Sequence, residues 1–65
     1  MTRETWERQF TQKLQEELGI TPEQIKLHWR GYYNQRFTPE GAIASLRETH
    51  RLYPELGLLP EKINN

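Results

Sequence analysis

Residues 28–37, HWRGYYNQRF, carry the side chains of this chain that are best suited to binding chemistry, namely four aromatic rings and two arginines. Arginine contacts phosphate groups and an aromatic ring stacks on a nucleobase, so this combination is typical of nucleic-acid binding. The same side chains also suit an acidic protein surface. A structural interpretation stands beside both, because a very small protein builds its core from large rings. The rings of Trp29, Tyr32 and Phe37 fit this structural interpretation best.

The charge around this stretch is locally basic. Residues 24–53 carry five basic and two acidic side chains, and no acid lies between Gln24 and Pro39. A patch of this kind attracts phosphates or carboxylates over a short range. A solvated helix face is the alternative, since interspersed arginine is common on small helical proteins.

The sequence does not indicate catalytic chemistry. Ser45 is the only serine, and it has no glycine-flanked elbow around it to present a nucleophile. His28 and His50 are expected to be structural, because no HxxxH motif or cluster of His and Asp supplies the three or four ligands that a metal needs. We therefore expect no enzyme, no catalytic residue, no metal site, no cofactor and no small-molecule substrate.

Length and composition limit the fold and the class of partner. The chain has 65 residues, 34% of them apolar and none of them cysteine, so we expect one domain, 1–65, with a thin core and no disulfide. Nine basic side chains balance nine glutamates, so no net charge attracts nucleic acid or anionic lipid. No apolar run approaches the roughly 18 residues of a membrane span, and the N-terminus lacks a signal-peptide layout. The expectation is a soluble, cytoplasmic protein without a membrane partner.

Three helices are predicted, near residues 3–18, 22–34 and 39–52, followed by a C-terminal segment, 54–65. Valine and aspartate are absent, whereas glutamate, glutamine, leucine and arginine are abundant, which favours helices over strands. Thr-Pro-Glu begins the second and third helices, because threonine caps a helix and proline suits its first position. Gly19 and Pro54 are predicted to end the first and third. Both Gly19 and Gly57 follow Glu-Leu, and we expect them to share one turn chemistry.

The fold class predicted is therefore all-α, a small three-helix bundle whose C-terminal segment is irregular or briefly helical. Apolar residues recur along one face of each predicted helix. The predicted core consists of Trp6, Phe10, Leu14, Leu18, Ile25, Trp29, Tyr32, Phe37, Ile43, Leu46 and Tyr53. Leu27 does not fit the pattern, because the predicted second helix, 22–34, would place it on the polar face, opposite the core. Either the C-terminal segment or a partner is expected to cover it.

Two functional hypotheses follow from these patterns. The first is a small non-enzymatic protein-interaction module that binds a protein partner or a second copy of itself as a homodimer. The second is a small nucleic-acid-binding regulator that uses the local basic and aromatic surface. The candidate partner-binding residues are Leu27, Arg30, Tyr33, Lys26, Arg36, Arg47 and Arg51.

Overall fold

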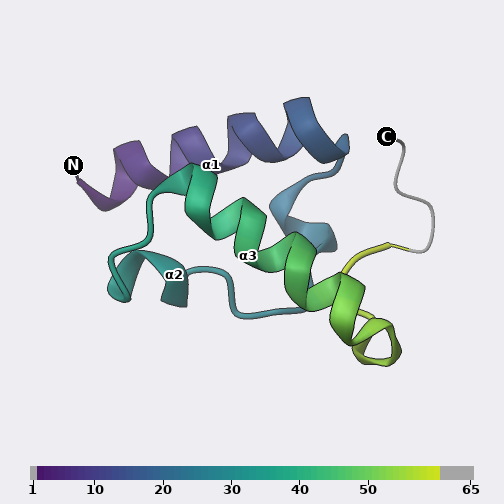
Figure 1. Ribbon diagram of the computed structural model, residues 1–65. Helices are drawn as coiled ribbons and strands as arrows, with labels where there is room; N and C mark the ends of the chain where they lie inside the picture. Colours follow the sequence, from purple (N-terminus) through teal and green to yellow (C-terminus); the bar gives the residue numbers. More distant parts are fainter. Residues whose placement is uncertain (1, 61–65) are drawn as a thin grey trace.

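The regular secondary structure is entirely helical in the part of the chain that the computed structural model describes, residues 2–60 (Figure 1). The elements in order are α1 (Arg3–Leu18), the 3₁₀ helix η1 (Pro22–Gln24), α2 (Gly31–Asn34), α3 (Pro39–Leu52) and the 3₁₀ helix η2 (Pro54–Leu56). No strand occurs within residues 2–60, so the all-α prediction is confirmed. The last part of the predicted C-terminal segment, residues 61–65, lies outside the described residues.

Helix α1 forms where its caps and its apolar spacing predict it. The Thr2 hydroxyl accepts a hydrogen bond from the Thr5 N–H at 3.2 Å, which satisfies one of the first-turn donors. Gly19 ends the helix in the left-handed conformation, with φ of 68°, which glycine adopts without a Cβ penalty. One face of α1 is buried, through Trp6, Phe10, Leu14 and Leu18.

Helix α3 packs across α1 and completes the main layer of the core (Figure 1). The Thr38 hydroxyl accepts a hydrogen bond from the Gly41 N–H at 3.0 Å, and Pro39 occupies the first turn. Ala42, Ile43 and Leu46 are buried. The small Ala42 lets the two helices approach closely, and the predicted bounds, 39–52, are confirmed.

The predicted second helix, 22–34, is wrong. Only Pro22–Gln24 and Gly31–Asn34 are helical, and the chain between them is irregular. Ile25 is extended, with φ of −90° and ψ of 127°. The Lys26 N–H, which a continuous α-helix would pair with the Pro22 carbonyl, instead donates to the Leu58 carbonyl at 3.0 Å. A contact with the C-terminal segment therefore replaces a helical hydrogen bond.

The irregular segment also explains the position of Leu27. Along IKLHW, residues 25–29, inward and outward side chains alternate: Ile25 and Trp29 are buried and Leu27 is half-buried, whereas Lys26 and His28 are exposed. The chain is extended at Ile25 and bends at Leu27, and this path turns all three apolar residues toward the core. A helix over the same residues would have directed Leu27 to the opposite side.

The C-terminal segment contributes to the core as far as the structure describes it. Leu58 and Leu59 are buried, as is Ile20 in the turn after α1, and none of the three belongs to the predicted core. Gly57, like Gly19, is left-handed, with φ of 61°, as the shared Glu-Leu-Gly turn predicts. Tyr53 is wrongly predicted as a core residue, because α3 ends at Leu52 and the chain leaves the helical path at Tyr53, which is 51% exposed.

The aromatic rings of α1 hold the irregular segment in place. The ring centres of Trp6 and Phe10 lie 5.2 Å apart, with 9° between the ring planes. The ring centres of Phe10 and Trp29 lie 5.0 Å apart, with 10° between the ring planes. Such parallel contacts stabilise beyond their buried area. The Trp6 indole N–H donates to the Phe37 carbonyl at 2.7 Å, which ties α1 to the chain entering α3.

Replacing Phe10 by alanine is expected to lower the free energy of unfolding by about 3–5 kcal/mol, because it removes the fully buried ring that lies parallel to both tryptophans. For a domain of this size such a loss leaves little or no folded protein at room temperature. Far-UV circular dichroism over a urea series that starts without urea measures the fraction of each variant that is folded. Tyr53→Ala is the matched control, with an expected change below about 1 kcal/mol; equal losses in the two variants would contradict the packing described.

Candidate functional site

Three of the five predicted basic side chains are paired with glutamates. Arg30 lies 3.4 Å from a carboxylate oxygen of Glu7, and Arg47 lies 3.5 Å from one of Glu17. Arg51 donates two hydrogen bonds to its helical neighbour Glu48. The local excess of positive charge that the sequence predicts is thus largely neutralised, in two cases by acids that are distant in sequence and lie on α1.

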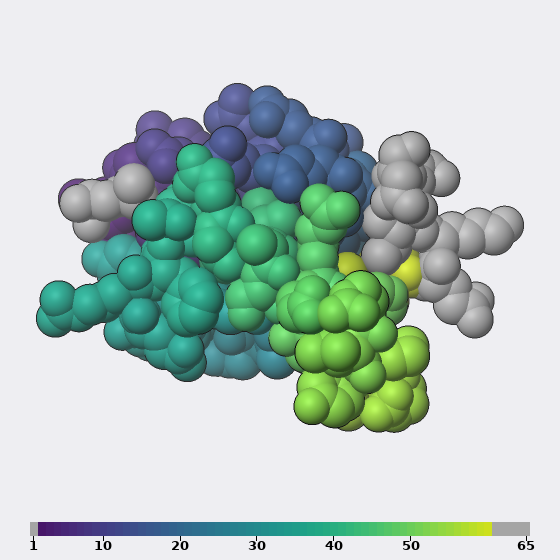
Figure 2. Space-filling model, in the orientation of Figure 1, coloured from purple at the N-terminus to yellow at the C-terminus, as the bar shows by residue number. Residues whose placement is uncertain are grey.

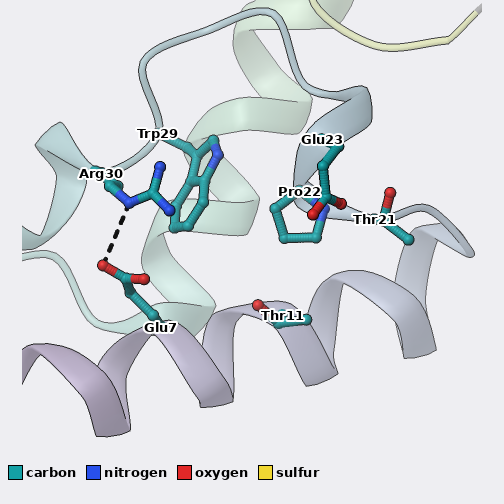
Figure 3. Close-up of a pocket in the computed structure, with 7 residues that line it drawn as sticks. All are labelled: Glu7, Thr11, Thr21, Pro22, Glu23, Trp29 and Arg30. Carbon is teal, nitrogen blue, oxygen red and sulfur yellow. Dashed lines mark ion pairs between the residues drawn. The ribbon is translucent and has the colours of Figure 1, made fainter.

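Arg30 also covers an aromatic ring. Its guanidinium lies 4.4 Å from the centre of the Trp29 ring while it pairs with Glu7 (Figure 3). A cation over an indole face gives a favourable electrostatic contact with the ring. Arg30 therefore links the irregular segment to α1, and this structural role accounts for its position without a partner.

A hollow opens beside this contact, between α1 and η1 (Figure 3). It is lined by Glu7, Thr11, Thr21, Pro22, Glu23, Trp29 and Arg30. Among the described residues, the only arginine that lines this hollow is Arg30, which pairs with Glu7. The indole ring of Trp29 is already in contact with Arg30 and with Phe10. The groups that would hold a ligand here are therefore largely engaged with one another.

The pair of Glu48 and Arg51 is exposed and local to the end of α3. The hydrogen bonds from Arg51 lower the pKa of Glu48, and those same bonds raise the pKa of Arg51. A depressed carboxyl pKa means that this pair favours the folded state above the ordinary glutamate pKa. The contribution disappears as the pH falls through the depressed pKa of Glu48.

Leu27 and Tyr33 are both only partly accessible, and each packs against the core. Leu27 is half-buried against the core. Tyr33 is also half-buried, with its ring 5.9 Å from Trp6 in an edge-to-face arrangement and 5.5 Å from the Arg3 guanidinium. The expectation that Leu27 projects from a polar helix face is wrong, because the segment that carries it is irregular and not helical.

Lys26 and Arg36 remain exposed, and neither forms an ion pair within residues 2–60. Arg36 has a left-handed backbone, with φ of 66°, which is uncommon for a residue with a side chain. It lies in the connection between α2 and α3, and its backbone N–H donates to the carbonyl of Tyr33 in α2 at 3.0 Å. The structure thus brings Arg36 and Tyr33 together and leaves Lys26 apart, beside the C-terminal segment.

The end of α3 carries a cluster that the sequence interpretation missed. Leu52, Tyr53 and Leu56 are 51%, 51% and 56% exposed, and we refer to them as the apolar end. This part of the molecule projects at the lower right of the space-filling view, in light green (Figure 2). The sequence contained a signal for this cluster in LYPEL, residues 52–56. This stretch has three large apolar residues around a proline that ends a helix.

The described residues supply few other polar groups for chemistry. The Nδ1 atom of His50 is buried without a hydrogen-bond partner, and His28 is exposed. Residues 2–60 hold no group of three or more His, Cys, Asp or Glu side chains arranged to bind a metal. None of the helices in the described range has the length and apolar character needed to cross a membrane.

Comparisons with known proteins give no relative. No family model matches the chain, and neither the curated proteins nor the solved structures contain a significant match. The geometry of this molecule is therefore the basis for inferring its function.

Replacing Leu27 by glutamate is expected to reduce the free energy of unfolding by about 2–3 kcal/mol, because it forces a charge against the core. Lys26→Glu is the matched control, since the neighbouring side chain is exposed and the expected change is about 0.5 kcal/mol or less. Urea denaturation curves of both variants make the comparison. If Leu27→Glu is as stable as Lys26→Glu, Leu27 is not part of the packed structure.

Proposed function

We propose that the protein is a non-enzymatic interaction module that self-associates through the apolar end. The observation that carries this proposal is the exposure of Leu52, Tyr53 and Leu56, each more than half accessible. Within residues 2–60 these are the large apolar side chains that stay exposed, while the others pack into or against the core.

The three exposed apolar residues lie close together in the sequence, and this proximity is what suggests a binding surface. Single exposed apolar residues are normal on proteins, whereas contiguous ones mark surfaces that bind a partner. The three side chains lie within five residues, on a helix end and the 3₁₀ turn that follows it. Tyrosine is also enriched at protein interfaces, because a large rigid ring is buried at low cost in conformational entropy.

Charge around the apolar end favours a second copy as the partner. Glu48 and Arg51 precede it on α3, and Glu55 lies within η2, so both signs flank the apolar residues. In a twofold symmetric contact the same patch meets itself, so the charged side chains of both signs beside the apolar end of one copy face those of the other. The formal net charge of zero removes the general repulsion between identical molecules.

The expected association is weak. A stable interface takes about 800 Å² from each partner, and three half-exposed side chains at one end of a helix supply only part of such an area. A dissociation constant on the order of 10–100 µM corresponds to a contact of this smaller class.

Nucleic-acid binding through the full set of five predicted basic residues has less support. Arg30, Arg47 and Arg51 are engaged with glutamates, so a phosphate would have to compete with a carboxylate at three of the five positions. Leu27, which was expected to accompany them, packs against the core.

The double variant Leu52→Glu and Leu56→Glu is expected to abolish self-association and to leave the fold intact, because both side chains are exposed and the added charges repel across a symmetric contact. Sedimentation equilibrium from about 10 µM to about 1 mM spans the expected dissociation constant. The unchanged protein should rise from the monomer mass toward twice that mass over this range, and the double variant should remain monomeric.

A matched control is Gln9→Glu with Gln15→Glu, which adds the same charge at exposed positions of α1 and should self-associate as the unchanged protein does. Far-UV circular dichroism and urea denaturation verify that all three proteins are folded. A monomeric unchanged protein at the highest concentration, or continued association of the double variant, would refute self-association through this end.

A further inference from the structure

A second hollow lies at the other end of α3, where α2 leads into it. Its volume is about 590 Å³, within the size range of small-ligand sites. It is lined by Trp6, Tyr33, Asn34, Arg36, Phe37, Thr38 and Pro39. The hollow shares no residue with the apolar end, so binding at this hollow does not depend on self-association through that end.

The hollow has aromatic walls that neighbouring groups hold in place. Tyr33 and Phe37 are both half-buried, which leaves part of each side chain accessible. The Phe37 ring packs edge-to-face on Tyr32, with ring centres 5.0 Å apart. Trp6 contacts Tyr33 in the same manner, and its N–H is satisfied by the Phe37 carbonyl. These contacts order the rings before a ligand arrives, which reduces the entropic cost of binding.

Two arginines at this hollow have no carboxylate partner in the described part of the chain. Arg36 lines the hollow and is exposed. Arg3 lies at its rim, because its guanidinium is 3.5 Å from the Asn34 amide oxygen and 5.5 Å from the centre of the Tyr33 ring. By contrast, Arg30, Arg47 and Arg51 each pair with a glutamate. Two cations that remain available for an anion therefore lie beside the aromatic walls, whereas the others without an ion pair within residues 2–60, Arg8 and Lys26, do not line the hollow.

We propose that this hollow binds a nucleotide unit of single-stranded nucleic acid. The base packs against the accessible parts of Tyr33 and Phe37, and the adjoining phosphates bind the guanidinium groups of Arg36 and Arg3. Aromatic stacking combined with arginine contacts to the backbone is the general mode of binding to single strands. A duplex keeps its bases stacked inside the helix, so this arrangement selects unpaired strands.

Salt dependence of binding gives the first test. The probe is a fluorescein-labelled single-stranded DNA of about ten nucleotides, and the readout is fluorescence anisotropy at several salt concentrations. Two phosphate contacts predict a slope of about −1.4 for the logarithm of the binding constant against the logarithm of salt, at about −0.7 per contact. The duplex of the same sequence should bind at least several-fold more weakly.

Variants identify the residues responsible. Arg36→Asn removes the guanidinium and keeps a residue that tolerates a φ of 66°, and Arg3→Gln removes the second cation. Each is expected to weaken binding about three- to tenfold and to reduce the slope by about 0.7. Arg8→Gln is the matched control: Arg8 also lacks a carboxylate partner within residues 2–60, but it does not line the hollow, and its loss should leave the binding constant within about twofold.

A mononucleotide distinguishes a free nucleotide from a strand. Competition by AMP, with shifts of the Tyr33 and Phe37 ring signals in NMR spectra, would show that one nucleotide unit suffices. Binding of the strand without competition by AMP would show that flanking phosphates are required, and either result supports the proposal. Absence of strand binding at low salt overturns it. Equal effects of Arg8→Gln and Arg36→Asn, or equal affinity for polyglutamate, would also overturn it.

Discussion

The contact of the α1 aromatic face with Trp29 is the constraint on which the rest of the structure depends. Residues 25–30 form only short turns and lack the hydrogen bonds of a continuous α-helix, so side-chain packing has to position them. Phe10, parallel to Trp6 and to Trp29, provides that packing on the core side. Arg30 adds a cation over the Trp29 ring and an ion pair to Glu7 on α1. One helix face thereby organises a segment that has little regular structure of its own.

This anchoring has a consequence for charge. Because the irregular segment and α3 both pack beside α1, the glutamates of α1 come within reach of arginines that are distant in sequence. The locally basic middle of the chain therefore becomes a nearly neutral surface. Arg3 and Arg36 form no such ion pair within the described residues and lie near Tyr33, at one end of α3. At the other end of α3 lies the exposed apolar end. The two ends of one helix thus offer chemically different surfaces.

The parts of the fold that could be predicted are those with local signals. Thr2 and Thr38 cap their helices as their positions indicate, and Gly19 and Gly57 are both left-handed after the repeated Glu-Leu. The secondary structure in the middle of the chain could not be predicted from local signals. The cap at Thr21 is correct, but the helix that begins there is only three residues long. The alternation in IKLHW was the competing signal, and it is too short to outweigh helical composition.

The sequence by itself determined the all-α class, the bounds of α1 and α3 and most of the core, because caps and apolar periodicity act between residues a few positions apart. Only the tertiary structure decided the path of residues 25–30, the half-burial of Leu27, the exposure of Tyr53 and the ion pairs of Arg30 and Arg47 with α1. These depend on contacts between distant segments, such as the Lys26 N–H with the Leu58 carbonyl and Trp29 with Phe10. Burial and hydrogen bonding across the chain outweigh helix propensity, which contributes only tenths of a kcal/mol, up to about 1, per residue.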